Sequence, residues 1–320
     1  MTMKYGFSTP MRGQLANFDD ISNLVLTGEK IGFSTVTVSD HIVVPTEIAS
    51  IYPYNESGEF EGRTSGECLE QLTTVATIAA ITSRLRILTS VMVLPHRNPV
   101  LTAKILATID VLSGGRLTIG CGTGWMKEEF EAIGAPIFEE RGQVSNEYIR
   151  IFKELWTSEN PSFSGKYSDF NGITFLPKPL QNPHPPIWIG GESAPALRRA
   201  ASIGDCWYPI GSNPRFPLHS PDLLKKRLER LHGISEEIGR DPNDIQLAFS
   251  ANWMNTDGEI QNKNGTRKSF TGNNEQIAGD IISLRNLGIH YISLNFPGET
   301  ANQIIENMHD FMSNIASLVD

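Results

Sequence analysis

One stretch of the chain, residues 85–129, most limits the folds that this sequence can adopt. Two apolar runs rich in β-branched residues, 85–94 and 116–120, are joined by a single helical segment that ends at Gly114 and Gly115. The pattern predicts a strand–helix–strand unit whose strands are buried on both faces, as in a parallel sheet. Ligands of such sheets bind at the carboxyl ends of the strands, so these ends are the first place to seek a functional site.

The helix within this unit carries apolar residues at helical spacing. Leu101, Ile105, Ile109 and Leu112 follow the i, i+4, i+8, i+11 pattern of one helix face. We therefore expect these four residues to be buried against the sheet. Similar spacing predicts buried faces for later helices, at Ile149, Phe152, Leu155 and Trp156, at Leu224, Leu228, Leu231 and Ile238, and at Ile304, Met308, Phe311 and Ile315.

The rest of the chain repeats this alternation of strand and helix. Further strands are predicted at residues 4–8, 34–38, 186–189, 206–210, 245–251 and 291–296, and each of the eight strands is followed by a helix. With no linker-like boundary and no internal repeat, the economical interpretation is one domain, residues 1–320, folded as a TIM (β/α)8 barrel with long loops at its C-terminal face. A doubly wound open sheet is the alternative, but no glycine-rich dinucleotide turn follows the first strand.

The composition argues against several kinds of partner. A net charge of −9 and a pI of about 5.3 argue against nucleic acid or an anionic membrane, since both require a basic surface. The sequence shows no signal peptide and no apolar run approaching about 18 residues. Cys68, Cys121 and Cys206 are scattered without a metal-binding spacing or a disulfide framework, which predicts a cytoplasmic protein. A small-molecule substrate, an anionic one included, is compatible with this charge, because a local pocket can differ from the whole surface.

Polar and small residues follow several predicted strands. Asp40 and His41 follow the second strand, where an imidazole can polarise a carbonyl group or exchange a proton; the alternative is a histidine that only closes a turn. Residues 190–193 (Gly-Gly-Glu-Ser) follow the fifth strand and open a helix, a pattern that binds phosphate through backbone N–H groups. The alternative there is an ordinary helix cap by Ser193. Residues 120–124 (GCGTG) allow close approach of a ring or phosphate chain, or tight packing alone.

Other residues near strand ends are expected to have ordinary structural roles. These roles are solvated loops for Arg12, His96 and Arg97, a solvated first helical turn for Glu128 and Glu129, and core packing for Trp125, Trp188 and Trp207. Two polar loops, 45–66 and 255–274, follow strands and therefore belong on the active face. We expect both loops to cover the substrate and exclude water. The sequence contains no Ser-His-Asp order, HExxH, CxxC or Walker motif.

Four motifs in order give the chain a resemblance to a known family. They are Ser39-Asp40-His41, Thr89-Ser90-Val91, RLTIGCGTGWMKEEFEAIG from residue 116 and PLQNPHPPIWIGGES from residue 179. Over residues 3–317 the chain resembles the bacterial luciferase-like monooxygenases, and most of all the branch of F420 (deazaflavin)-dependent oxidoreductases. The resemblance implies a TIM barrel that holds an isoalloxazine-type cofactor in its mouth, F420 or alternatively FMN.

The resemblance also implies roles for individual residues. His41 corresponds to the family's active-site histidine, and Asp40 is expected close to the ring. A non-proline cis peptide bond is expected between Ser90 and Val91, in a bulge behind the ring. The other implied cofactor contacts are Gly122, Thr123, Gly190, Gly191, Glu192 and Ser193, the last four around the phosphate and its ribityl chain. Trp125 stands where some deazaflavin dehydrogenases carry a catalytic glutamate, which argues against a sugar-phosphate dehydrogenase.

The implied activity is hydride transfer from reduced F420 to a small substrate, or oxygenation of such a substrate. An FMN-dependent two-component monooxygenase, supplied with reduced cofactor by a separate reductase, is the alternative. A flavin-binding protein without turnover is a second alternative. A barrel hydrolase or lyase lacks any convergent set of carboxylates, lysines or metal ligands, and no metal site is expected. Many members of the family are dimers with early helices in the interface, so the resemblance implies a homodimer.

Overall fold

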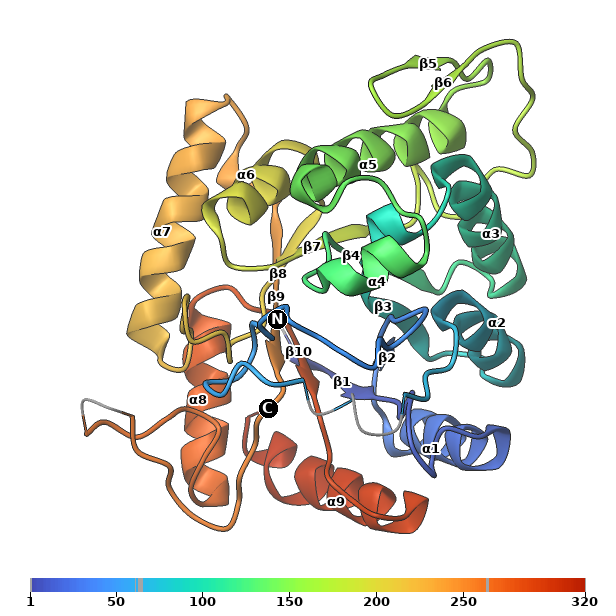
Figure 1. Cartoon of the computed structure of the whole chain (residues 1–320). Coiled ribbons are helices and arrows are strands. Elements are labelled where there is room, and N and C mark those ends of the chain that lie inside the picture. The colour runs from blue at the N-terminus through green and yellow to red at the C-terminus, as the bar shows by residue number, and fades with distance from the viewer. Residues whose placement is uncertain (1, 61, 63–65, 263–264, 320) are drawn as a thin grey trace.

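Eight parallel strands close into a barrel in the computed structural model, which describes residues 2–60, 62, 66–262 and 265–319 (Figure 1). The order around the barrel is β1, β2, β3, β4, β7, β8, β9 and β10. The strands are β1 Lys4–Ser8, β2 Thr35–Val38, β3 Arg86–Val93, β4 Leu117–Gly122, β7 Ile187–Gly190, β8 Cys206–Tyr208, β9 Gln246–Ala251 and β10 Tyr291–Leu294. Each overlaps a strand expected from the sequence, so the predicted TIM barrel is confirmed.

Helices cover the outside of this barrel (Figure 1). They are α1 Phe18–Ile31, α2 Gln71–Ile81, α3 Pro99–Leu112, α5 Arg141–Thr157, α6 Ala194–Ile203, α7 Pro221–Glu237, α8 Asn274–Asn286 and α9 Ala301–Asn314. The short helix α4 Lys127–Ala132 follows β4 and lies inside this ring, at the mouth of the barrel (Figure 1). Between α5 and β7 the chain forms a short antiparallel hairpin, β5 Phe163–Ser164 and β6 Asp169–Phe170. No helix in the described residues is both long and apolar enough to cross a membrane.

The predicted apolar faces of α5 and α9 are confirmed. Ile149, Phe152 and Leu155 of α5 are completely buried, and Met308 and Phe311 of α9 are at most 1% exposed. The N-terminus of α9 is fixed by a reciprocal capping box between the helix cap and the third helical residue. Periodicity and capping signals therefore agree for these helices, and the helices cover the strands as expected.

The predicted buried face of α3 is wrong at two of its four residues: Ile109 is buried and Ile105 packs against the core, but Leu101 and Leu112 do not. Leu101 and Leu112 are 59% and 75% exposed, and Ile238 at the end of α7 is also exposed, at 42%, because it lies beyond the last helical turn. The buried face of α3 consists of Pro99, Thr102, Ala103, Leu106, Ala107, Ile109 and Asp110. Small alanines let α3 approach α5, where Trp156 Nε1 donates a hydrogen bond to the Ala103 carbonyl at 3.1 Å. Because α3 is apolar on most sides, spacing alone could not select the face that packs inward.

Candidate active site

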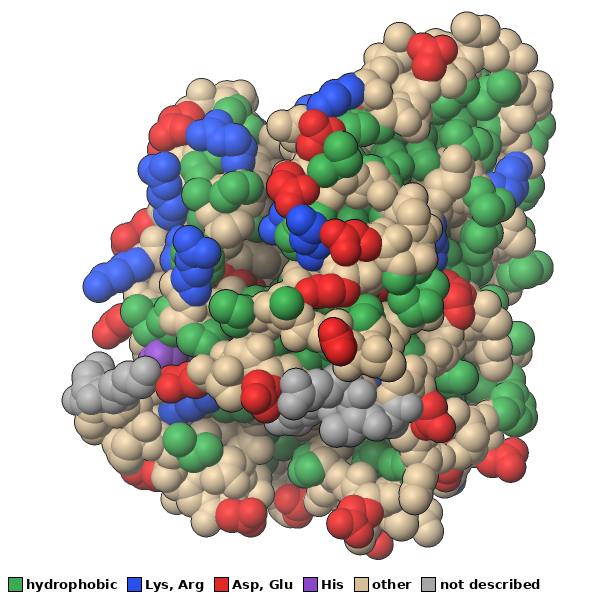
Figure 2. Space-filling view, viewed as in Figure 1, with side chains coloured by type: hydrophobic (Ala, Val, Ile, Leu, Met, Phe, Trp, Pro, Cys, Tyr) green, Lys and Arg blue, Asp and Glu red, His purple; other side chains and the backbone are tan. Residues whose placement is uncertain are grey.

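A cavity of about 1140 Å³ opens at the carboxyl ends of the strands. Its lining includes every residue to which the sequence assigned a site role, namely Asp40, His41, Ser90, Val91, Gly122, Thr123, Gly190, Gly191, Glu192 and Ser193. In the space-filling view of this face a hollow lies beside α7, where Lys and Arg side chains (blue) gather (Figure 2). Pockets for one small ligand usually have about 300–1,000 Å³. The cavity therefore has room for a cofactor and a second molecule.

Val91 forms part of the cavity wall between two glycines. The Ser90–Val91 peptide bond is cis, and the pairing of β3 with β4 shifts register at this point, so both the cis bond and the bulge are present as predicted. A Cβ atom on Gly122 would lie 2.5 Å from Val91 Cγ2, and one on Gly190 would lie 3.0 Å from Val91 Cγ1. The two glycines are thus required to seat Val91. Val91 therefore presents an apolar side chain to the cavity, which is suited to contact with one face of a planar ring.

Hydroxyl groups inside the barrel hold Ser90 in place next to Val91. Tyr208 Oη lies 3.1 Å from Ser90 Oγ and 2.6 Å from Ser293 Oγ. Burial raises the pKa of Tyr208, despite hydrogen bonds that lower it, so the phenol stays neutral. The hydrogen-bonded chain runs from β3 through β8 to β10 and fixes the position of the cis bond.

The start of α6 gives the cavity a part suited to an anion. Ser193 Oγ accepts a hydrogen bond from Ala196 N at 3.4 Å, so the helix-cap role considered for this serine is confirmed. The hydroxyl can still donate its own proton to a ligand. Arg141 and Arg199 line the same cavity, and Arg199 Nε donates to Asn146 Oδ1 at 2.6 Å, which orients its guanidinium group. A helix N-terminus with two guanidinium groups matches the charge and hydrogen-bonding needs of a phosphate group.

Glu192 uses both carboxylate oxygens within the protein. It is 2% exposed, and it accepts hydrogen bonds from Ile210 N at 2.8 Å and Asn213 Nδ2 at 2.9 Å. Burial raises the pKa of Glu192 to about 6, although these hydrogen bonds lower it in part. The side chain therefore ties the start of α6 to the segment after β8. A direct contact between Glu192 and a cofactor stays a prediction.

The pH dependence of stability should report the ionisation of Glu192. Its pKa is about 6 in the folded protein against 4.5 for an ordinary glutamate, so the folded state binds the proton more tightly. Glu192 then favours folding most below about pH 4.5, and about 2 kcal/mol of this contribution should be lost as the pH rises through 6. Urea unfolding of the wild type and of Glu192→Gln measures this loss. As the pH rises from 4.5 to above 6, the free energy of unfolding of the wild type should fall by about 2 kcal/mol relative to that of the variant.

A second glutamate provides a control of opposite sign. Burial raises the pKa of Glu128, but hydrogen bonds from Ser50 and Ala49 outweigh burial, and the pKa is lowered overall. Its contribution to stability should therefore be lost as the pH falls, and Glu128→Gln should show the reverse trend. If the difference in unfolding free energy between the wild type and Glu192→Gln stayed constant with pH, the raised pKa of Glu192 would be contradicted.

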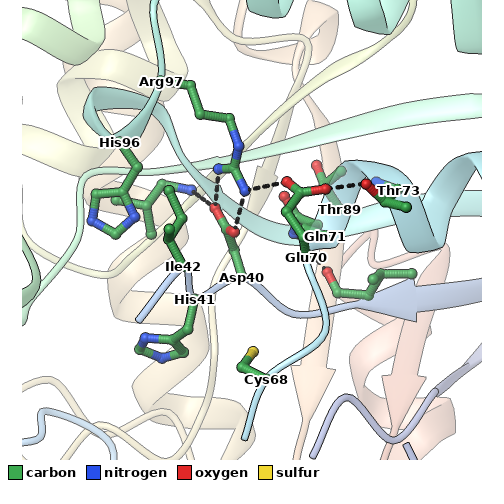
Figure 3. A network of polar contacts seen from close by, with 12 residues as sticks. Asp40, His41, Ile42, Cys68, Glu70, Gln71, Thr73, Thr89, His96 and Arg97 are labelled. Atoms are coloured by element: carbon green, nitrogen blue, oxygen red, sulfur yellow. Dashed lines mark hydrogen bonds and ion pairs between the residues drawn. The ribbon is translucent and has the colours of Figure 1, made fainter. Parts of the chain in front are cut away.

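Asp40 lies at the cavity, but its carboxylate is held inside a buried network (Figure 3). Arg97 donates to both carboxylate oxygens at 2.7 Å, and Val93 N donates to Oδ2 at 2.9 Å. Arg97 also pairs with Glu70 at 2.7 Å, which joins the ends of β2 and β3 to the start of α2. The prediction that Arg97 is solvated is wrong, since its side chain is 13% exposed. Close contact of Asp40 with a cofactor ring stays a prediction.

His41 presents its imidazole ring to the cavity. Its Nδ1 lies 2.8 Å from Glu129 Oε2, which leaves Nε2 as the nitrogen available to a ligand. The ring also contacts Phe60 and Trp125, with centroids 5.1 and 6.4 Å away. Figure 3 shows the side chains of Asp40 and His41 pointing in different directions. Of these two neighbours, His41 is the one that keeps a reactive atom, Nε2, without a hydrogen-bond partner in the part of the chain that the structure describes.

Glu129 and His96 are the functional-site residues that the sequence did not reveal. The prediction that they are solvated is wrong, because they are 2% and 8% exposed. Glu129 Oε1 accepts a hydrogen bond from Ile42 N at 2.7 Å, so the first turn of α4 packs against the chain after β2. Glu129 and His41 are 88 residues apart, and no local spacing could pair them. The one sequence signal was a carboxylate directly before Phe130, a buried aromatic residue.

Aromatic side chains form a wall between His41 and solvent. Tyr52 and Phe60, from the chain between β2 and α2, contact Trp125 with ring centroids 5.2 and 5.3 Å away. Arg12 lies over the Phe60 ring at 4.6 Å, so its predicted solvation is wrong. Trp125 lines the cavity rather than the core, whereas the predicted core positions of Trp188 and Trp207 are confirmed.

The two long loops differ in their relation to the cavity. Six described residues of loop 45–66, namely Ser50, Ile51, Tyr52, Pro53, Tyr54 and Phe60, line it, which supports a covering role. In Figure 1 this segment, in blue, crosses in front of the strands. The described part of loop 255–274 contributes no lining residue, so a covering role for it has no support. Residues 61, 63–65 and 263–264 of these loops lie outside the described residues.

Comparison with known proteins identifies the family to which this chain belongs. The profile described as luciferase-like monooxygenase matches residues 3–290. The chain belongs to the luciferase-like monooxygenase family. It is 32% identical over 267 residues to the FMNH2-dependent dimethylsulfone monooxygenase of Pseudomonas putida, covering 71% of this chain and 73% of that protein. The family predicted from the sequence motifs is confirmed, and this member of it is an oxidoreductase.

Solved structures share the fold of this luciferase-like protein at low sequence identity. An F420-dependent secondary alcohol dehydrogenase in complex with an F420–acetone adduct matches with a TM-score of 0.76 and 16% identity over 100% of both chains. Monooxygenase RslO1 from Streptomyces bottropensis matches with a TM-score of 0.73 and 20% identity, covering 98% of this chain and 99% of that one. Because both are distant in sequence, they show the shared barrel and do not choose between cofactors.

Proposed function

We propose that this chain is a two-component monooxygenase that receives reduced FMN from a separate reductase and oxygenates a small organic molecule. The observation that carries the proposal is one cavity that combines the apolar side chain of Val91, the N-terminus of α6 and the ring of His41, whose Nε2 is not engaged by Glu129. The relative at 32% identity is named for FMNH2, which favours FMN over F420, the cofactor first expected from the sequence.

The residues present fit a flavin with a terminal phosphate. The ring would lie against Val91, and the phosphate would be held by Ser193 together with Arg141 and Arg199. When bound, the reduced flavin supplies the electrons for oxygenation, which amino-acid side chains cannot provide. FMN ends at its phosphate, so a cradle of one helix N-terminus and two guanidinium groups is sufficient for it.

The protein's own part in the reaction is to position, shield and move a proton. His41 can accept or donate a proton at Nε2 beside the reacting molecules. The wall of Tyr52, Phe60 and Trp125 excludes water from that position and gives the substrate an apolar surface. We therefore propose a small substrate with an apolar portion. Dimethyl sulfone, named for the relative, is the first compound to test.

Binding of FMN and riboflavin to the full chain tests the phosphate cradle. FMN should bind about 10- to 100-fold more tightly, because charge-assisted hydrogen bonds to the phosphate are each worth about 1.5–3 kcal/mol. The measurement is anaerobic fluorescence titration with each reduced flavin and with reduced F420, followed by oxygen consumption in the presence of dimethyl sulfone and other small organic molecules.

Each result of this experiment decides between named functions. Tight binding of reduced FMN and substrate-dependent product formation support the monooxygenase. Binding of F420 alone, with reduction of an electron-poor substrate, would replace it by the hydride-transfer alternative. Equal affinity for FMN and riboflavin would remove the proposed cradle, and no binding of any of the three would refute the proposal.

Three expectations about the setting of this enzyme stay predictions. A separate reductase belongs to the proposed two-component reaction, and the cytoplasmic location rests on the scattered cysteines. The homodimer rests on the family resemblance. Exposure of Leu101 and Leu112 on α3, one of the early helices, supports it by leaving apolar side chains at the surface that a second copy could cover.

A further inference from the structure

We infer that Glu129 is a positioning residue for His41: it fixes the imidazole ring with its proton on Nδ1 and directs the lone pair of Nε2 into the cavity. The structural part of this inference concerns the chain alone, while its kinetic part rests on the proposed function. Nothing in the family resemblance assigns a role to this glutamate.

The carboxylate of Glu129 is held so that it cannot turn away from His41. Its Oε2 lies 2.8 Å from His41 Nδ1, and its Oε1 accepts hydrogen bonds from the backbone N–H groups of Ile42 at 2.7 Å and Val43 at 3.3 Å. Both oxygens are therefore engaged, and the side chain is 2% exposed. The backbone N–H group of Ile42, the residue after His41, thus helps to orient the Glu129 carboxylate, and this carboxylate orients the His41 ring.

An ionised carboxylate can only accept hydrogen bonds, and this restricts the imidazole. Burial raises the pKa of Glu129, but the hydrogen bonds from the His41 side chain and the Ile42 backbone, together with the two nearby histidines, outweigh burial, so the pKa is lowered overall. Glu129 is therefore ionised at neutral pH, and His41 Nδ1 must carry the hydrogen of their contact. Nε2 is left with its lone pair directed into the cavity, which is the arrangement that a proton acceptor needs.

The proton that His41 moves can be followed atom by atom. Nε2 accepts it from the reacting molecules, and the ring becomes an imidazolium with a hydrogen on each nitrogen. Its positive charge then lies against the Glu129 carboxylate, which stabilises it without taking the proton. The same proton leaves from Nε2 when it is returned, so both residues end in their starting forms.

A second histidine, His96, borders this pair and stays neutral. His96 Nδ1 lies 4.0 Å from Glu129 Oε1, and its side chain is 1% exposed. Neither ring nitrogen of His96 has a hydrogen-bond partner among the described residues, and the ring packs edge-on against Phe130 at 4.8 Å. Burial lowers the pKa of His96, despite the nearby carboxylates of Glu129 and Asp40, so this ring stays neutral.

The neighbouring glutamate supplies a matched control. Glu128 Oε1 also accepts two backbone N–H groups, from Ala49 at 2.8 Å and Ser50 at 2.9 Å, and it also anchors the chain after β2. No contact joins it to His41 among the described residues. If anchoring that chain were all that Glu129 does, the variants Glu128→Gln and Glu129→Gln should behave alike.

The test reads the ring of His41 directly, in the full chain without cofactor. Long-range 1H–15N spectra of histidine-labelled protein at about pH 8.5, where an ordinary imidazole is neutral, distinguish the two neutral tautomers. The chain has seven histidines, and the signals of His41 are assigned as those missing from the spectrum of His41→Asn. Wild type and Glu128→Gln should show the Nδ1–H form at His41. Glu129→Gln, whose amide both donates and accepts, should populate the Nε2–H form, and Glu129→Asp should restore the Nδ1–H form.

Kinetic measurements on the same variants provide a second test of the role of Glu129. Glu129→Gln should lower kcat about 100-fold, and in a His41→Asn background it should cost less than about a further twofold, because the glutamate acts through the histidine. An unchanged His41 tautomer in Glu129→Gln, or full additivity of the two substitutions, overturns the inference. Should the chain oxygenate no substrate, the proposed function fails while the tautomer still decides the role of Glu129.

Discussion

Replacing His41 with asparagine should lower kcat by about 100- to 10,000-fold while the Kd for reduced FMN changes by less than about twofold. Asparagine can still donate a hydrogen bond to Glu129, so the buried carboxylate keeps a partner. It cannot take up or release a proton near neutral pH, and the proton-transfer role at the cavity is lost. Steady-state oxygenation measures kcat, and anaerobic fluorescence titration measures the Kd.

His309→Asn is the matched control for this variant. His309 is exposed on α9, on the outside of the barrel, and it should lose neither activity nor cofactor affinity when changed in the same way. A fall in cofactor affinity as large as the fall in kcat would show that His41 holds the cofactor instead of acting on the reaction. Full activity in His41→Asn would remove the proton-transfer role altogether.

The barrel could be predicted because the amino-acid composition of its strands indicates that they are buried. All four residues of β2, Thr-Val-Thr-Val, are buried, and β-branched residues favour an extended chain. Parallel strands that are buried on both faces, each followed by a helix, leave few arrangements besides a closed barrel. Helix faces are harder to predict, as Leu101 and Leu112 show: in a helix that is apolar on most sides, the inward face is chosen by the neighbours and not by its own spacing.

The location of the site could be predicted from the sequence, but the contacts between its side chains could not. Strand ends converge on one rim in any such barrel, so residues found after separate strands meet at one cavity. Their partners come from barrel closure and loop packing: Arg97 reaches Asp40 across 57 residues, and Glu129 reaches His41 across 88. The glycines illustrate the same limit. Gly122 and Gly190 were expected to admit a cofactor, and the structure shows that they also make the space for Val91.

Replacing Arg97 with leucine should lower the free energy of unfolding by about 3–5 kcal/mol. The variant leaves the Asp40 carboxylate, whose side chain is 0% exposed, without its bidentate partner; among the described residues, only the Val93 N–H group then stabilises its charge. An uncompensated charge in the interior costs far more than the loss of a surface ion pair, because water cannot reach it. Urea unfolding monitored by tryptophan fluorescence measures the change.

Two further variants separate the buried charge from the rest of the network. Glu70→Gln should cost only about 1 kcal/mol or less, because the Glu70 side chain is 41% exposed and glutamine can still cap α2. Adding Asp40→Asn to Arg97→Leu removes the stranded charge and should restore part of the lost stability. If Arg97→Leu cost no more than Glu70→Gln, the ends of β2 and β3 would not depend on the Asp40–Arg97 pair, and the position of His41 would have to be fixed by Glu129 and the packing of its ring alone.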